Sequence, residues 1–429
     1  MPLIKLNMYR ITTSIFLFTV TILVMQPANA QRILNYNEYI KNVREKNIEY
    51  IVEKYNVSIA EANAQAAKVI PDPEFSVSYE DYQDWDLRMG RGYAAELGYT
   101  LELGGKRRAR MAVAKSEQQM TEALVEDFFR NLRADATLCY LEALMQKQLM
   151  DLAFSSYQSM KDLSRADSLR YAIGEIAEVD AMQSRLEATT MMTAYLQAKL
   201  EYKNMLSDLV VFEGGTATID SLAGSLPLVI RTYQLLQLID LAQDNRADLK
   251  AAIRNRELSA ANLRLAKADR AIDLGLNIGF ALNKENQEIA AGGEKEQFKT
   301  YSAGVTIPLK FSNLNKGELR AAKYTQQQAD SQYDAVLLQI RKEVEQCYNS
   351  YISACWQAEL YQKLTLTDAA TILEKKKYSY IHGETSLLEV LDAQRTANEV
   401  YQSYYETLYN ANASLVELYR VVGIWDVAF

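Results

Sequence analysis

The chain has 429 residues, a formal net charge of −8 and only one histidine, His382. A single histidine excludes catalytic groups and metal sites built on several histidines, and no phosphate-binding glycine loop or cysteine pair at metal-binding spacing is present. We therefore expect no enzyme, no cofactor and no metal centre, and the lack of a basic block after residue 30 argues against nucleic acid as a partner.

Residues 1–30 have the features of a secretory signal peptide. Lys5 and Arg10 supply positive charge, the stretch 11–25 is mainly apolar, and Ala-Asn-Ala at 28–30 fits a small-residue cleavage site. The apolar stretch is shorter than the roughly 20 residues that a membrane-spanning helix needs. The mature chain is expected to begin just after residue 30.

A first structural repeat is predicted over residues 31–214. It opens with a run over 32–70 that contains no glycine or proline and has a loose helical pattern. Two segments that alternate apolar and polar residues follow, and they predict strands at about 74–81 and 92–103. The charged connection between these strands is expected to be a loop over 81–91.

Long uninterrupted helices are predicted after the strands. A run of 67 residues without glycine or proline, 107–173, ends at Gly174, and a second such run of 39 residues follows that glycine. At about 1.5 Å per residue, a helix of this length extends about 100 Å, several times the diameter of a compact domain. The helices are therefore expected to build a rod or a tube in which they pack as coiled coils.

The second part of the chain repeats this plan. Residues 215–227 are rich in glycine, serine and threonine and predict a linker with little structure of its own. The second repeat is predicted over 228–429, with strands at about 274–283 and 300–310, a charged connection over 284–299 and a long helical run that ends at Gly383. The predicted fold is mainly α, with duplicated helix–strand–strand–helix–helix halves.

The four strands fit two architectures. Alternation of apolar and polar residues is typical of a soluble sandwich as well as of a membrane barrel. Strands of about 9–11 residues with tyrosine and phenylalanine on the apolar face, behind a signal peptide, favour a transmembrane barrel. Since four strands cannot close a barrel, several copies must contribute; two would give a filled interior, and three, which we favour, would leave a pore.

Several local strings resemble the TolC family of outer-membrane efflux proteins. Residues 101–107 read LELGGKR, similar to the strand-to-helix return of the branch that serves metal and drug pumps, and 414–423 resemble the end of family members. Residues 171–185 and 380–394 align without a gap at an offset of 209 and look like the periplasmic turns of the family. The resemblance covers essentially the whole mature chain.

This resemblance implies a fold, a location and partners. It implies a homotrimer with a twelve-stranded barrel in the outer membrane of a Gram-negative bacterium and a long α-helical barrel in the periplasm. The closed periplasmic tip would open when a periplasmic adaptor and an inner-membrane pump dock. The chain would then be the passive exit duct of a tripartite efflux pump for metal cations or drugs.

The resemblance also places a gate at the two predicted turns. Gly174 and Gly383 are expected to act as turn hinges, because glycine adopts positive φ without strain. Glu389 and Asp392 are three residues apart and lie on one helix face, so that copies of the chain could form an acidic ring that favours cations. The alternative is that these acids complement the dipole of the helix N-terminus.

A tyrosine–aspartate lock is implied at the same turns. In the family, an aspartate at the position of Asp180 bonds a tyrosine at the position of Tyr380, and both residue types are present in this sequence. An arginine that some members use in a contact between chains would fall at Thr385, so that restraint is expected to be missing.

The cysteines bear on membrane anchoring. Cys139, Cys347 and Cys355 lie in predicted helices, and the last two are two helical turns apart, beyond the reach of a disulfide. Many relatives carry a lipidated N-terminal cysteine, whereas the first cysteine here is Cys139. We therefore expect contact with outer-membrane lipid through the strands and no lipid anchor.

Two other functions remain open from the sequence. The exit channel of a one-step (type I) protein secretion system uses the same fold, and the inner-membrane partner would choose the cargo. A periplasmic coiled-coil scaffold without a pore would explain the long helices and the 28 tyrosines. It would not explain strands at matching positions in both halves.

Overall fold

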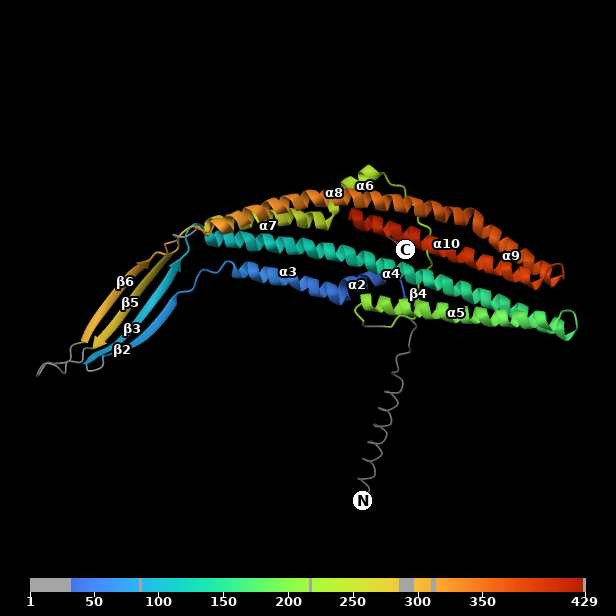
Figure 1. The fold of residues 1–429 in the computed structure, drawn as a ribbon, viewed down its shortest axis with the longest axis horizontal. Coiled ribbons are helices and arrows are strands. Elements are labelled where there is room, and N and C mark those ends of the chain that lie inside the picture. The colour runs from blue at the N-terminus through green and yellow to red at the C-terminus, as the bar shows by residue number, and fades with distance from the viewer. Residues whose placement is uncertain (1–31, 85–86, 216–217, 285–296, 310–313, 427–429) are drawn as a thin grey trace, which may run out of the picture.

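The computed structural model of the chain describes residues 32–84, 87–215, 218–284, 297–309 and 314–426. The predicted signal peptide lies outside these residues. The described part is elongated, with a β-sheet at one end and long helices that run away from it toward two helical turns at the other end (Figure 1).

The helices and strands of the two halves follow one another in the same order. The first half contains α2 (Tyr36–Lys46), α3 (Ile48–Ala66), β2 (Glu74–Asp84), β3 (Leu87–Leu101), α4 (Lys106–Ala172) and α5 (Glu178–Phe212). The second half contains α6 (Leu235–Asn245), α7 (Ala247–Ala268), β5 (Leu274–Lys284), β6 (Gln297–Thr306), α8 (Lys316–Leu360), the π-helix η1 (Tyr361–Thr365), α9 (Leu366–Ile381) and α10 (Leu387–Val422).

Two helical runs are broken where the sequence predicted continuity. The first run ends and restarts at Asn47, whose side-chain oxygen accepts a hydrogen bond from the backbone N–H of Tyr50 at 2.9 Å and so caps α3. The long helix of the second half contains the π-helix η1 between α8 and α9, whereas its counterpart α4 is α-helical throughout. A short π-helical insertion of this kind has no glycine or proline to reveal it.

The four long strands form one antiparallel sheet in the order β2-β3-β5-β6. The register aligns apolar residues across it, as in the row Phe75, Leu97, Ile278 and Ala303. These apolar side chains are exposed; Phe75, for example, keeps 70% of its surface. On the polar face, the Asn277 side-chain amide donates to Glu96 at 2.7 Å. Alternation therefore gives the sheet one apolar and one polar face, both uncovered in the single chain.

The strand ends differ from those predicted. β2 and β3 pair through most of the expected loop over 81–91, where Arg91 lies 3.7 Å from Asp81 and so keeps the charged residues within the ladder. β6 stops at Thr306 because its partner β5 begins at Leu274 and because Pro308 has no N–H to donate. The expected loop over 284–299 falls mainly outside the described residues.

The predicted linker is packed rather than unstructured. A short strand β4 (Ser221–Leu222) pairs in parallel with β1 (Ile33–Leu34). Leu222 is 1% exposed, and its backbone N–H donates to the hydroxyl of Tyr202 at 3.0 Å. The segment has little regular structure beyond this short strand, but scattered apolar residues, too few to give a pattern, insert into the helical core.

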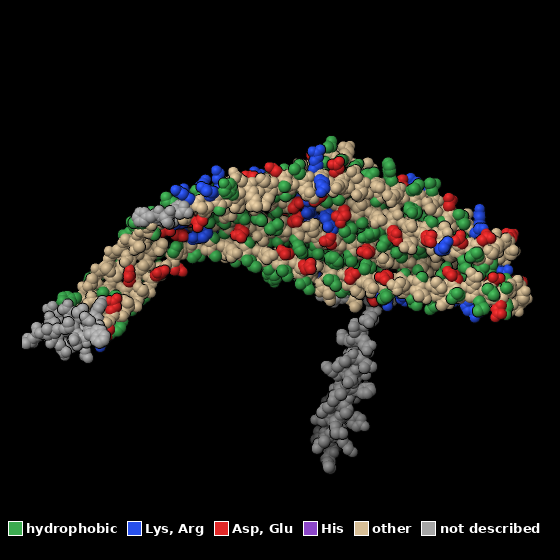
Figure 2. All heavy atoms as spheres, in the orientation of Figure 1, with side chains coloured by type: hydrophobic (Ala, Val, Ile, Leu, Met, Phe, Trp, Pro, Cys, Tyr) green, Lys and Arg blue, Asp and Glu red, His purple; other side chains and the backbone are tan. Residues whose placement is uncertain are grey.

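The main hydrophobic core lies midway along the helices, where the two halves meet. One cluster joins α2, α4, α5 and α10, and its buried members include Tyr39, Tyr140, Leu209, Leu408 and Val416. Figure 2 shows hydrophobic side chains along the visible face of the helices as well, interspersed with acidic and basic ones. The surface thus keeps apolar area that the single chain does not cover.

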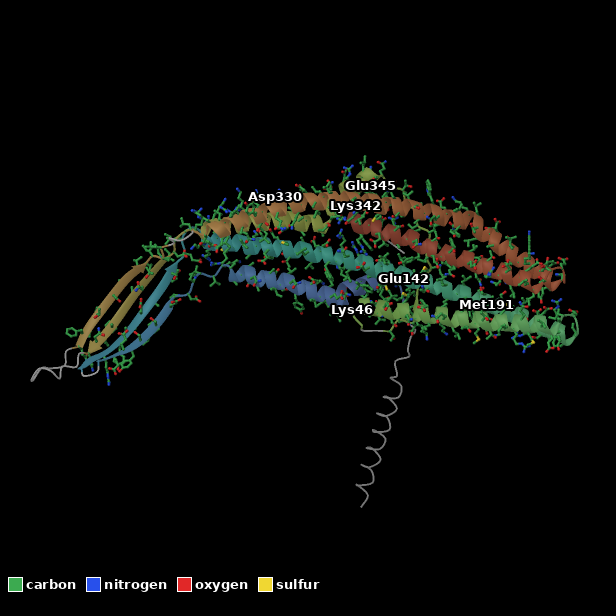
Figure 3. The ribbon with its side chains drawn as sticks, viewed as in Figure 1. Lys46, Glu142, Met191, Asp330, Lys342 and Glu345 are labelled. Carbon is green, nitrogen blue, oxygen red and sulfur yellow. The ribbon has the colours of Figure 1, made fainter. Side chains whose placement is uncertain are left out.

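Charged side chains complete the packing between neighbouring helices. Asp330 of α8 lies 2.7 Å from Arg256 of α7, while Lys342 and Glu345 are exposed on α8 (Figure 3). No helix among the described residues is both long and apolar enough to cross a membrane.

Candidate functional site

The two helical turns lie together at the end of the molecule opposite the sheet (Figure 1). We call them the first tip turn, between α4 and α5, and the second tip turn, between α9 and α10. Gly174 has φ +83° and Gly383 has φ +78°, and each donates its N–H to the carbonyl three residues earlier, at 2.9 and 3.0 Å. This left-handed glycine at a helix C-terminus is a geometry that other residues adopt only with strain.

The lock tyrosine has a partner that the sequence did not predict. The hydroxyl of Tyr380, on α9, donates to Oδ1 of Asp167, on α4, at 3.0 Å. The expected bond to Asp180 is absent from the hydrogen bonds of the described residues. The reason is the packing: Tyr380 meets α4 one helical turn before that helix ends, whereas Asp180 lies on α5, beyond the turn.

Asp167 is fully buried, at 0% exposure, and its surroundings are mixed in charge. A guanidinium nitrogen of Arg170 lies 3.9 Å from Oδ1, and the same guanidinium lies over the ring of Tyr380, 5.4 Å from its centroid. The second oxygen, Oδ2, has no hydrogen-bond partner within the described part of the chain. Burial raises the pKa of Asp167, the neighbouring Tyr380, Ser184 and Arg170 oppose that rise, and the charge of Asp180 adds to it.

Burial also raises the pKa of Tyr380, and the hydrogen bond to Asp167 raises it further. The phenol is therefore a proton donor across the whole physiological range of pH. It ties the second half of the chain to the first at the tip.

The second tip turn is held by exposed ion pairs. Glu389 pairs with Lys376 across the turn, and this contact is the main cause that lowers the pKa of Glu389. Asp392 pairs with Arg395 at 2.8 Å. Both acids predicted for a ring therefore carry a positive partner within their own chain. Thr385 lies in the turn before α10 and is only partly exposed.

The sequence analysis missed three residues of this site: Asp167, Arg170 and Lys376. A signal for two of them was present in the internal repeat, because the offset of 209 that aligns the turns also aligns Asp167 with Lys376 (167 + 209 = 376). The same offset pairs Asp180 with Glu389. The first tip turn thus has two acids, Asp167 and Asp180, at the positions where the second tip turn has Lys376 and Glu389.

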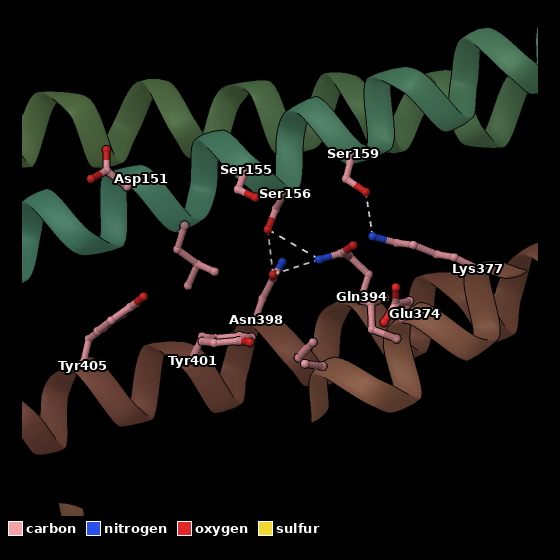
Figure 4. A pocket seen from close by; sticks show the side chains of 14 residues that line it. Asp151, Ser155, Ser156, Ser159, Glu374, Lys377, Gln394, Asn398, Tyr401 and Tyr405 are labelled. Atoms are coloured by element: carbon pink, nitrogen blue, oxygen red, sulfur yellow. Dashed lines mark hydrogen bonds between the residues drawn. The ribbon is translucent and has the colours of Figure 1, made fainter. Parts of the chain in front are cut away.

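A polar seam connects the halves farther from the turns. A groove of about 550 Å³ lies between α4 and the α9–α10 pair (Figure 4). Across it, Ser156 donates to the side-chain oxygen of Asn398 at 2.7 Å, Gln394 donates to the same oxygen at 3.0 Å, and Lys377 donates to Ser159 at 2.6 Å. Partial burial lowers the pKa of Lys377.

The contact between the halves therefore changes along the helices. Midway along the helices this contact is a broad apolar core. Near the tip it consists of the polar seam, the Tyr380–Asp167 bond and a small apolar cluster. This cluster includes Met160 and Val390, and Met191 lies at its margin (Figure 3). Polar contacts exchange readily for contacts with water, so they separate at lower cost than an apolar core. The contact between the halves is therefore more polar near the tip than midway along the helices.

Comparison with known proteins identifies relatives of the chain. The profile of the family "Outer membrane efflux protein" matches residues 238–424. The chain is 22% identical over 364 residues to the cobalt-zinc-cadmium resistance protein CzcC of Cupriavidus metallidurans, covering 85% of this chain and 84% of that one. It is 24% identical over 314 residues to the cation efflux system protein CusC of Escherichia coli K12, covering 70% of this chain and 63% of CusC.

A solved structure of CusC has the same fold. It superposes with a TM-score of 0.74 at 18% sequence identity and covers 94% of this chain and 96% of that one. The relatives are channel proteins and not enzymes. The helical hairpins, the four-stranded sheet and the relatives agree: the chain resembles the TolC family of outer membrane efflux proteins, and the two curated relatives above are named for metal resistance and cation efflux.

Proposed function

We propose that three copies of the chain form the exit duct of a tripartite efflux pump for metal cations. The observation that carries this proposal is the four-stranded sheet, which is apolar on one face and unpaired at both edges, β2 and β6. In lipid, unpaired N–H and C=O groups cost several kcal/mol each, so the edges must pair with other copies of the sheet. Three copies supply twelve strands, enough for a barrel with a pore.

The helices support the same assembly. α3 and α5 lie along one long edge of the molecule, and α8 and α9 lie along the other (Figure 1). Both edges carry exposed apolar side chains at helical spacing: Ile48, Val52, Tyr55 and Ile59 on α3, and Trp356, Leu360 and Leu364 on α8 and η1. In a closed ring of copies, one edge would cover the other and bury these residues.

Anchoring is proposed to come from the strands and not from a lipid. Cys139 lies within α4, and Cys347 and Cys355 lie within α8. These helices belong to the proposed periplasmic part, and all three cysteines contact hydrophobic clusters. Radiolabelled palmitate should therefore fail to label the protein in cells.

The tip is proposed to be the periplasmic gate. Its closed form is held by Tyr380 on Asp167 and by the polar seam, and Gly174 and Gly383 are the turn hinges. Glu389 and Asp392 would line the constriction, with Asp180 nearby, and would attract cations. Their ion pairs with Lys376 and Arg395 would weaken this attraction. A periplasmic adaptor and an inner-membrane pump would supply the force that opens the gate.

The metal assignment rests on the relatives, because no residue of a passive duct selects its cargo. CzcC is named for cobalt, zinc and cadmium resistance, and CusC is named as a cation efflux protein. The test is growth of a strain that lacks this gene on graded metals, bile salts, dyes and antibiotics. We expect hypersensitivity to divalent or monovalent metals alone, reversed by the wild-type gene.

Two other outcomes would replace the proposal. Hypersensitivity to bile salts and dyes would assign the duct to a drug pump. Normal growth on every agent, together with loss of a secreted protein from the medium, would assign it to type I secretion. Recovery of the protein as a soluble periplasmic product would remove the channel altogether and leave the scaffold.

A further inference from the structure

We propose that the buried carboxyl of Asp167, with Asp180 as a neighbouring like charge, binds a proton that favours the closed tip when the surrounding solution is acidic. The inference rests on the proposed gate and adds to it a chemical signal. It concerns one tip turn only, because the positions that align with these two acids in the other turn hold Lys376 and Glu389.

The carboxyl of Asp167 is buried, and only one of its two oxygens accepts the hydrogen bond from Tyr380. Asp167 is at 0% exposure, Oδ1 accepts from Tyr380 at 3.0 Å, and Oδ2 has no partner in the part of the chain that the structure describes. The hydroxyl of Ser184 on α5 interacts with the Asp167 carboxyl; this serine is also fully buried, and its hydroxyl donates to the carbonyl of Ala181 at 3.2 Å. A buried, charged oxygen without a donor is costly.

A proton on Oδ2 removes that cost. The neutral carboxyl keeps Oδ1 as the acceptor for Tyr380 and gains an O–H that donates. The Oγ of Ser184, whose hydroxyl interacts with this carboxyl, is the acceptor on α5 that this O–H would meet. The proton would thus add a hydrogen bond between α4 and α5 while it leaves the bond to α9 in place.

The helices that pack around Asp167 supply both favourable and unfavourable charges. Arg170 of α4 is the favourable charge, at 3.9 Å, but its guanidinium also binds Glu175 at 3.3 Å. Asp180 of α5 is a like charge, and α9 contributes the neutral phenol of Tyr380. α10 contributes apolar Leu387 and Val390 to the cluster around that phenol. Asp167 therefore shares its arginine with Glu175 and has Asp180 as a like charge, so proton uptake by Asp167 is favoured.

The direction of the pH effect follows from linkage. The folded, closed tip holds the pKa of Asp167 above its ordinary value of 3.8, and opening would expose the carboxyl to water and lower its pKa again. The closed tip therefore binds the proton more tightly than the open tip. Closure is favoured as the pH falls toward 3.8 and is lost as it rises through the raised pKa.

The experiment is conductance of the full-length protein in planar bilayers, with the pH varied on the side of the tip. We expect wild-type conductance to fall on acidification, with the ratio of closed to open tips changing by up to about tenfold per pH unit for each copy. Asp167→Asn should give low conductance at every pH, because the amide retains the acceptor for Tyr380 and carries a permanent donor in place of the proton.

Two further variants sharpen this result. Asp180→Asn removes the like charge and should move the conductance change to lower pH without abolishing it. Glu389→Gln, at the aligned position of the second turn, should leave the pH of the change where it is in wild type. A wild-type pH response in Asp167→Asn would overturn the proposal.

An infrared measurement separates this proposal from the proposed function. The difference spectrum of the purified protein between neutral and acidic buffer should contain the band of a buried, protonated carboxyl that Asp167→Asn removes. If the protein conducts no ions, the exit duct fails while this band still tests the proton site. If the protein conducts but the band is the same in wild type and Asp167→Asn, the proton site fails alone.

Discussion

The two tip turns of this chain have the same backbone and different side chains. Each ends a long helix with a glycine at positive φ, and each places a glutamate directly after that glycine. In both, the residue four before the glycine donates to that glutamate: Arg170 to Glu175 at 3.3 Å, and Ser379 to Glu384 at 3.0 Å. The duplication has kept the turn itself.

The charges beyond the glutamate have diverged. The second turn joins Lys376 to Glu389 in an exposed pair that needs nothing from the first half. The first turn has Asp167 and Asp180 at these positions, and its buried acid depends on Tyr380 from the second half. The buried acid of the first turn thus bonds to the other half of the chain, whereas the charged pair of the second turn stays within its own half.

The largest effect is expected from Tyr380→Phe. The change leaves the ring in place but removes the hydrogen bond from the Tyr380 hydroxyl to Oδ1 of Asp167, and a hydrogen bond to a charged group contributes about 1.5–3 kcal/mol. The closed tip should lose about this much free energy in each copy. Planar-bilayer conductance at neutral pH should rise accordingly.

Tyr171→Phe is the matched control for this prediction. Tyr171 holds the aligned position in the first half but is 44% exposed. Its loss should leave conductance unchanged. If Tyr171→Phe and Tyr380→Phe raised conductance equally, the bond between Tyr380 and the buried Asp167 would not be what distinguishes the two turns.

A smaller and symmetrical effect is expected from Gly174→Ala and Gly383→Ala. A Cβ at either position meets no atom within 4 Å, so the cost is that of the left-handed backbone alone, about 1–2 kcal/mol. Thermal unfolding in detergent should show similar losses for both. Gly317→Ala is the control: Gly317 lies near the start of α8, and a Cβ there also meets no atom within 4 Å but needs no left-handed backbone, so this change should not lower the stability of the protein.

Unequal losses at Gly174 and Gly383 would be informative. They would show that one turn carries strain or contacts that its backbone does not reveal. An increase in conductance without a loss of stability would instead support the role of these glycines as hinges.

The sequence predicted the plan of this fold well because its main signals are local. Glycine and proline mark the helix ends, and period-two alternation marks the strands, so each of the four predicted strands overlaps an observed one. The π-helix η1 was missed because no glycine or proline marks it, and the burial of Leu222 was missed because it depends on contacts between distant segments. Local pattern carries no information on such contacts.

The tip shows the same limit at the level of single residues. The glycines at 174 and 383 were placed correctly at positive φ, since the turn itself requires it. The partner of Tyr380 was wrong because it depends on which face of a 67-residue helix meets α9. The internal alignment of Asp167 with Lys376 would have drawn attention to this position, but only packing shows that the acid is buried.

The smallest effect is expected from Glu389→Gln. The pKa of Glu389 is lowered below its ordinary value of 4.5, chiefly by Lys376, so the pair stabilises the second turn above pH 4.5 and is lost as the pH falls through the lowered pKa. Because both side chains are exposed, salt should screen the effect, and the variant should differ from wild type only at neutral pH and low ionic strength. Thermal unfolding at two pH values and two salt concentrations measures this, with Asp392→Asn as a second exposed pair for comparison. Acidification should stabilise the first turn, because Asp167 takes up a proton there, whereas it should weaken the Lys376–Glu389 pair of the second turn. If acidification instead destabilises the protein and Asp167→Asn abolishes that loss, the two turns respond to acid in the same direction and the comparison fails.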